Sequence, residues 1–166
     1  MIDTQDISPS LSQLFSELVD GASAPGGAFI LNSGDAGLLG SLDRLTAAQA
    51  SQAHEGGATI AAHAEHLYYG LSLMNRWASE GGDPFSDATW EAAWKTTTVD
   101  EREWTAIRGR LRDVARRWLQ ALSVPRRVAP AELNVMIGSI AHLAYHMGAI
   151  RQIAAKARGP REGTYQ

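Results

Sequence analysis

Apolar residues recur every three or four positions along several stretches of the chain, a spacing typical of helices with one buried face. The first stretch starts at Ser8 and Pro9, where a hydroxyl can cap a helix and proline is tolerated, and it ends near Gly21. Glycine, serine and proline favour a loop over residues 22–34, and a second helical piece is expected over residues 35–50. Three consecutive apolar residues are expected to anchor this loop to other apolar side chains: Phe29, Ile30 and Leu31.

A long central helix is expected over residues 59–79, where a threonine can cap the start and no proline interrupts the apolar face. Glycine and proline in residues 80–84 end this helix. The segment that follows, residues 85–94, has weak helical character and carries Trp90 and Trp94. We expect it to lie over the other helices, and the sequence leaves open whether it is a lid or an interface with another subunit.

Two further helices are expected in the second half of the chain. Thr98 and Glu101 have the spacing of a capping box, and the apolar stripe that follows runs until Pro125. The last helix is expected to start near Pro130 and to continue until Gly159 ends it.

The order of these elements predicts the fold class. No stretch alternates between apolar and polar residues as a strand would. Four substantial helices with short or moderate connections predict an all-α fold, an antiparallel four-helix bundle with an extra helical segment in the connections. A length of 166 residues is in the range of one domain, which is expected to cover residues 1–166.

Composition and charge exclude several function classes. The chain is 45% hydrophobic and 20% charged, as soluble globular proteins are, and we expect no apolar stretch that approaches the roughly 20 residues of a membrane span. A net charge of -3 without long runs of one sign makes neither nucleic acid nor a membrane an expected partner. The absence of cysteine excludes disulfides, thiolate metal ligands and a cysteine nucleophile. Residues 1–10 do not resemble a signal peptide, so a cytoplasmic location is expected.

Two of the five histidines stand four residues apart on the last predicted helix, at His142 and His146. At about 100° per residue their side chains are offset by roughly 40°, so both can reach one metal ion through neutral imidazole nitrogens. Two histidines are too few for a tight site, and the central helix offers His63 and His66 as a third ligand. These two are about 60° apart around the helix, and periodicity alone does not choose between them.

The residues around these histidines resemble the DinB-like superfamily, with AEHL at residues 64–67 and HLAYH at residues 142–146. In that family a histidine of the second bundle helix and an HxxxH pair of the last helix bind a divalent metal ion. The resemblance therefore implies His66, His142 and His146 as ligands, zinc or nickel as the metal, an open position for water or substrate, and a homodimer. His63 has no counterpart in the family pattern.

Three neutral imidazoles would leave a zinc-like ion with its positive charge and a vacant position, which lowers the pKa of a bound thiol or water. The first hypothesis is a metal-dependent transferase that activates a low-molecular-weight thiol for attack on a small electrophile, similar to the thiol S-transferases and the thiol-dependent maleylpyruvate isomerase of this superfamily. The second is a metal-dependent hydrolase, which is weakened because Glu65 lies about 100° from His66 around the helix. The third is a non-catalytic metal-binding stress-response protein.

Other aromatic and imidazole side chains have simpler interpretations. We expect His63 to stand behind the ligands or in a cavity wall, and His54 to be a solvated loop residue. The tryptophans are expected to pack in the core and in the covering segment. Tyr69 and Tyr145 flank the ligands and are expected to be ordinary buried tyrosines, although either could donate a hydrogen bond near the metal.

Overall fold

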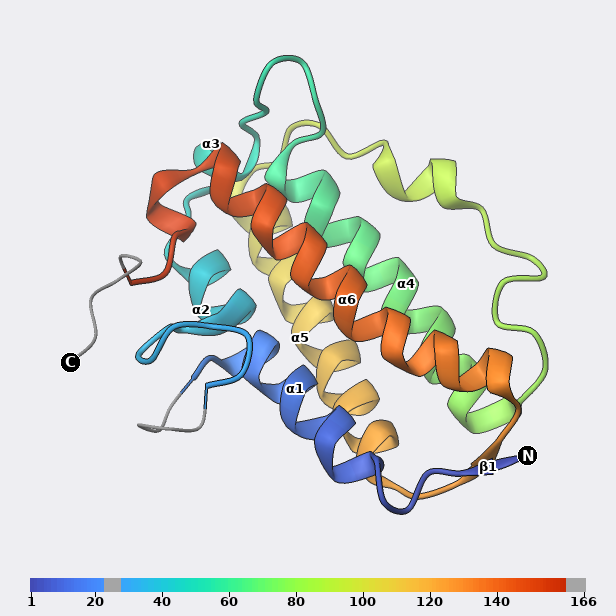
Figure 1. Cartoon of the computed structure of the whole chain (residues 1–166). Helices are drawn as coiled ribbons and strands as arrows, with labels where there is room; N and C mark the ends of the chain where they lie inside the picture. The colour runs from blue at the N-terminus through green and yellow to red at the C-terminus, as the bar shows by residue number, and fades with distance from the viewer. Residues whose placement is uncertain (23–27, 161–166) are drawn as a thin grey trace.

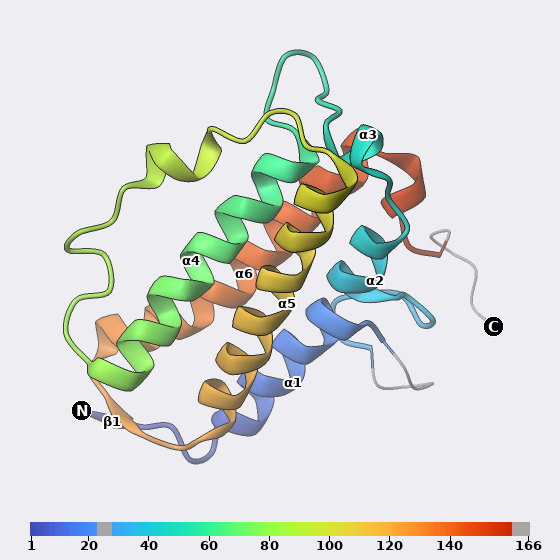
Figure 2. The same cartoon turned by 180° about the vertical axis from the view of Figure 1, so that it is seen from behind.

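The computed structural model describes residues 1–22 and 28–160, and the described part is mostly helical, as predicted. Four long helices lie side by side (Figures 1 and 2). α4 packs against α5 and α6, and α1 packs against the same two helices, so each long helix contacts two others. The four helices are α1 (Ser8–Asp20), α4 (Ile60–Glu80), α5 (Glu101–Ser123) and α6 (Pro130–Ile153).

Short elements fill the connections. The single helical piece expected over residues 35–50 is divided into α2 (Gly37–Asp43) and α3 (Ala47–Ala50). Thr46 caps α3 in a capping box with Gln49, and this second start is what separates the two helices. The described residues also contain two 3₁₀ helices, η1 (Trp90–Trp94) and η2 (Ala155–Ala157).

The expectation that the chain has no strand is wrong in one place. β1 (Ile2–Asp3) pairs antiparallel with β2 (Arg127–Val128), and Ile2 lies opposite Val128. Because each strand has two residues, neither can show the alternation by which a strand is recognised in a sequence. The pair ties the start of the chain to the connection between α5 and α6.

Helix starts and ends differ in detail from the predictions. The hydroxyl of Thr59 caps α4 as expected, accepting a hydrogen bond from the Ala62 N–H at 3.1 Å. The capping box of α5 is formed by Asp100 and Glu103, two residues after the predicted pair.

α1 starts at Ser8, as predicted, but the predicted capping role of this residue is wrong, and so is the predicted end of α6. Ser8 is the first helical residue and donates its hydroxyl hydrogen to Thr4 Oγ1 at 3.0 Å, so it does not cap the helix. α6 ends at Ile153, before the predicted stop at Gly159, because the backbone turns extended at Ala154.

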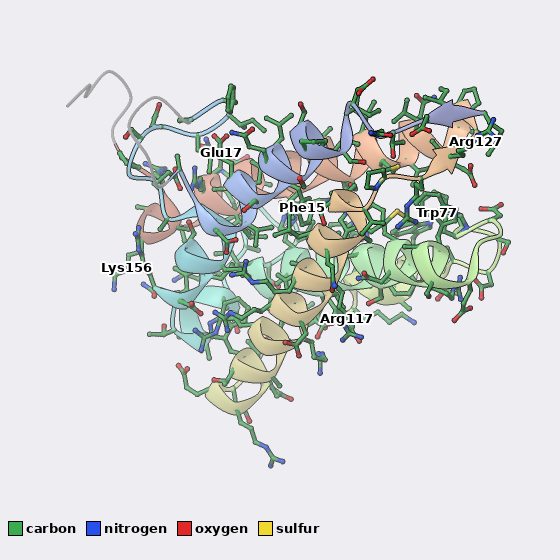
Figure 3. The ribbon with its side chains drawn as sticks, turned by 90° about the horizontal axis from the view of Figure 1, so that it is seen from below. Phe15, Glu17, Trp77, Arg117, Arg127 and Lys156 are labelled. Carbon is green, nitrogen blue, oxygen red and sulfur yellow. The ribbon has the colours of Figure 1, made fainter. Side chains whose placement is uncertain are left out.

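The core between the long helices is built around large aromatic side chains. Phe15, Trp104 and Trp118 are fully buried, and Figure 3 shows Phe15 and Trp77 with the surrounding helices. The two buried indoles keep a hydrogen-bond partner, since Trp104 Nε1 donates to the Leu45 carbonyl and Trp118 Nε1 donates to Ser139 Oγ, both at 2.9 Å.

The described part of the loop after α1 is held by a buried carboxylate. Glu17 is 5% exposed, and its two oxygens accept hydrogen bonds of 2.6 to 3.1 Å from the backbone N–H groups of Phe29, Ile30 and Leu31. The side chains of Phe29 and Ile30 are exposed. The expected apolar anchoring is therefore wrong for these two, and the backbone provides the attachment.

α6 is the one helix of residues 1–22 and 28–160 that is long and apolar enough, by length and composition alone, to cross a membrane. This differs from the expectation that no stretch would approach that length. One side of α6 packs into the core through Met136, Leu143 and Ile150, which are buried. Part of the apolar composition of α6 is therefore explained by the side chains that it buries in the core.

Candidate metal centre

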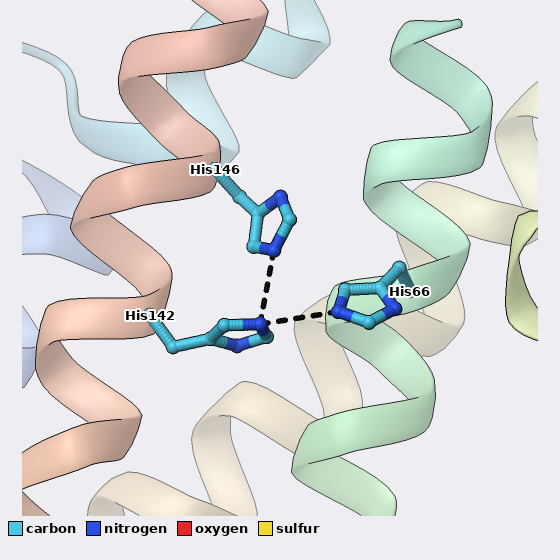
Figure 4. Close-up of side chains that lie close together, drawn as sticks. All are labelled: His66, His142 and His146. Carbon is cyan, nitrogen blue, oxygen red and sulfur yellow. Dashed lines mark hydrogen bonds between the residues drawn. The ribbon is translucent and has the colours of Figure 1, made fainter. Parts of the chain in front are cut away.

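Three histidines from two helices point toward one another (Figure 4). His142 Nε2 on α6 lies 2.9 Å from His146 Nε2 and 3.1 Å from His66 Nε2 on α4. One ligand atom of each residue lies within 4.8 Å of the others. The structure thus brings together the three residues that the sequence singled out as ligands.

The local structure explains this convergence. His142 and His146 are one turn apart on α6, so their rings leave the same side of the helix. α4 starts at its Thr59 cap and passes beside α6, which carries His66 to the level of the pair. His66 and His146 are buried, and His142 is half-buried, so the cluster opens on the side of His142.

The nitrogen contacts are poorly explained as ordinary hydrogen bonds. An imidazole nitrogen carries either one proton or one lone pair in the ring plane, so His142 Nε2 can form one well-directed hydrogen bond, not two. A cation can accept the lone pairs of all three Nε2 atoms. Zn–N bonds of about 2.0–2.1 Å in tetrahedral geometry need nitrogens about 3.3 Å apart. The two contacts of His142, at 2.9 and 3.1 Å, are close to this value, and three ligands would leave a fourth position open.

Burial keeps the imidazoles neutral. Burial, together with the charges of His142 and His63, lowers the pKa of His66 to about 4. Burial likewise lowers the pKa of His146 to about 3, with contributions from the charges of the other three imidazoles, and it lowers the pKa of His142 and of His63. At neutral pH the rings are therefore unprotonated, which is the form that binds a metal ion.

His63 stands directly behind the cluster. Its Nδ1 lies 2.9 Å from His146 Nδ1, on the side of that ring opposite Nε2. One of the two nitrogens must carry the proton of this hydrogen bond. If His146 holds its proton on Nδ1 and donates it to His63, its Nε2 has a free lone pair that faces His142 and His66. Metal-binding histidines commonly donate their other ring N–H to a neighbouring acceptor in this way.

Two tryptophans of η1 cover the cluster. The Trp94 ring stacks on His66 with centroids 4.2 Å apart, and the Trp90 ring lies 5.5 Å from the same imidazole. The segment is fixed to α4 because Tyr69 Oη accepts a 2.7 Å hydrogen bond from the Thr89 N–H. The sequence left open whether this segment is a lid or an interface, and these contacts show it as a cover over the histidines.

Several residues that the sequence singled out lie outside the cluster. His54 is exposed, as expected, and Glu65 pairs with Arg110 of α5. Tyr145 is 70% exposed, so its interpretation as a buried tyrosine is wrong, and Tyr69 is half-buried and bonded to the covering segment. The stacking of Trp94 on His66 was not predicted, because the segment that carries the tryptophan has no periodic pattern in the sequence.

The chain matches no protein-family model, no curated protein and no solved structure. None of these comparisons supports the resemblance to the DinB-like superfamily that the sequence motifs indicated.

Proposed function

We propose that this protein is a DinB-like metal-binding protein, an antiparallel four-helix bundle in which His66, His142 and His146 hold one divalent ion. The observation that carries the proposal is the convergence of three neutral Nε2 atoms from α4 and α6. Imidazole ligands suit zinc and nickel, which are the metals we propose.

We further propose that the site serves a transferase that joins a low-molecular-weight thiol to a small electrophile. A divalent ion held by neutral ligands would keep its positive charge and lower the pKa of the thiol toward neutrality. The thiol loses its proton to solvent, its sulfur forms a bond to the electrophilic carbon, and the leaving group departs with the bonding electron pair. The chain has no cysteine, so the sulfur must come from a cosubstrate.

The side chains around the histidines favour thiol transfer over hydrolysis. A hydrolase needs a general base near the attacking water. Glu65, the carboxylate nearest to His66 in the sequence, is paired with Arg110 on the side of α5 and is not available to the cluster. Trp90 and Trp94 cover the imidazoles with apolar rings, which would limit the access of water.

A homodimer in the cytoplasm is part of the same proposal. α6 exposes Ile137 and Tyr145, at 49% and 70%, and a second copy packed on this helix would cover them. Sedimentation velocity measures the oligomeric state, and a monomer at every concentration would contradict the dimer.

The test is thiol conjugation followed with 1-chloro-2,4-dinitrobenzene and a panel of low-molecular-weight thiols. We expect turnover by zinc-loaded or nickel-loaded protein, loss of turnover after chelation and in His142→Ala, and full turnover in His54→Ala, where an exposed histidine outside the cluster is removed. Ester cleavage without thiol turnover would favour a hydrolase instead. Full metal occupancy with no turnover of either kind would contradict the transferase and leave a binding protein.

A further inference from the structure

A cavity of about 520 Å³ lies between α4 and α6 and reaches the histidine cluster. His66 and His142 form part of its wall, so a molecule inside it would touch the side of the cluster that is half-open. The size is in the range of small-molecule sites in proteins. Most of the remaining wall is apolar, with contributions from Leu67, Leu71, Met74, Phe85, Trp90 and Val135.

The cavity offers almost nothing to a charged ligand. Among the described residues that line it there is no Asp, Glu, Lys or Arg side chain. Ser139 lines it, but its hydroxyl already donates to the Met136 carbonyl at 2.7 Å and accepts from Trp118 Nε1. Asn134, which is exposed, adds one neutral amide to the wall. A charged group placed here would lose its hydration without gaining an oppositely charged side chain from the protein wall.

Gly70 keeps the cavity open where α4 faces it. A Cβ atom at this position would lie 3.8 Å from the Trp90 ring and 3.9 Å from His142 Cε1, in ordinary contact with both. A methyl group therefore fits, whereas a longer side chain at position 70 must enter the space beside these two rings.

The aromatic rings of Phe85 and Trp90 form one wall of the cavity. The Phe85 and Trp90 rings have centroids 5.8 Å apart, and each is more than a third exposed. Arg76 of α4 fixes the segment that carries them, with a 2.9 Å hydrogen bond to Asp87 and a 3.2 Å hydrogen bond to the Pro84 carbonyl. An aromatic ligand could stack or pack edge-on against such a wall.

We infer that this cavity binds the electrophilic substrate, and that this substrate is an uncharged, mostly apolar molecule with an aromatic ring. The assignment of the ligand as the substrate rests on the proposed function, because it places the reactive end of the molecule at His66 and His142. The chemical class of the ligand follows from the cavity wall itself.

The test uses two unreactive probes that share one ring, 1,3-dinitrobenzene and 3,5-dinitrobenzoate. Their binding to metal-free protein is measured by calorimetry or ligand-detected NMR, so no cation attracts the carboxylate. We expect dinitrobenzene to bind at least about tenfold more tightly than dinitrobenzoate, because the wall cannot replace the hydration of the charge. This comparison needs no variant.

Two matched variants locate the binding site. Gly70→Leu should weaken dinitrobenzene binding to the metal-free protein at least about tenfold by filling the cavity. Gly109→Leu is the control, since Gly109 of α5 has open space around it and lies outside the cavity. Equal affinity for both probes, or unchanged dinitrobenzene affinity in Gly70→Leu, would overturn the inference. Dinitrobenzene binding by a protein that takes up no metal would refute the proposed function but support the ligand class.

Discussion

Acidification should destabilise the metal-free protein through the buried histidines. The pKa of His66 in the folded chain is about 4 and that of His146 about 3, against about 6.5 for a histidine in an unfolded chain. Between these values the unfolded chain binds protons that the folded chain does not. The free energy of unfolding is therefore highest above pH 6.5. It falls progressively as the pH drops toward 4, because protons bind to the unfolded chain.

The expected size follows from the same pKa values. At pH 5.5 an unfolded histidine is about 90% protonated, which lowers the free energy of the unfolded chain by about 1.4 kcal/mol. His66 and His146 together should remove about 2–3 kcal/mol of unfolding free energy between pH 7.5 and pH 5.5. His63 and His142, whose pKa values are also lowered by burial, act in the same direction. A loss of this size is a large part of a typical stability of about 5–15 kcal/mol.

Urea unfolding in the presence of a chelator, at pH 7.5, 6.5 and 5.5, measures this dependence. The double variant His66→Gln/His146→Gln should have a clearly shallower pH dependence than the wild type, because glutamine does not titrate. His54→Ala should keep the wild-type dependence, since His54 is exposed and outside the cluster. Equal stability of the wild type at pH 7.5 and 5.5, or the same slope in the double variant, would refute the reasoning.

Two further predictions concern the loop after α1. Glu17→Ala should lower the unfolding free energy by about 2–4 kcal/mol, since it removes the acceptor of four backbone hydrogen bonds, and Glu17→Gln should lower it less. Chemical denaturation measures both variants. An Ala variant as stable as the wild type would contradict the role of Glu17 in holding the loop. Gly21→Ala should destabilise by at least about 2 kcal/mol in thermal unfolding, because Gly21 has φ +97° and an added Cβ would overlap the Asp35 carbonyl oxygen. The control is Gly109→Ala, which has open space and should be neutral or stabilising.

The long helices could be predicted because their buried faces repeat at the helical period. The same regularity is enough to place His142 and His146 on one side of α6. The choice of His66 over His63 could not be made in this way, because it depends on how far α4 is rotated about its axis against α6. In the structure His66 faces the pair with Nε2, and His63 meets the far side of His146.

Features that depend on long-range contacts could not be predicted from the sequence. Glu17 appears in the sequence as one more polar position of α1, and only the return of the loop over it makes it a buried acceptor. The pairing of Ile2 with Val128 joins residues far apart in the chain through strands too short to have a pattern. Trp94 reaches His66 from the short 3₁₀ helix η1, where neither periodicity nor motif spacing in the sequence indicates the direction of a side chain.

The central claim is that His66, His142 and His146 hold one metal ion, and metal content tests it most directly. Wild-type protein, His142→Ala and His54→Ala are each loaded with zinc, desalted and measured by elemental analysis. We predict about one zinc per chain in the wild type and in His54→Ala, and a small fraction of that in His142→Ala, since two histidines do not make a tight site. Zinc content in His142→Ala equal to that of the wild type would contradict the account.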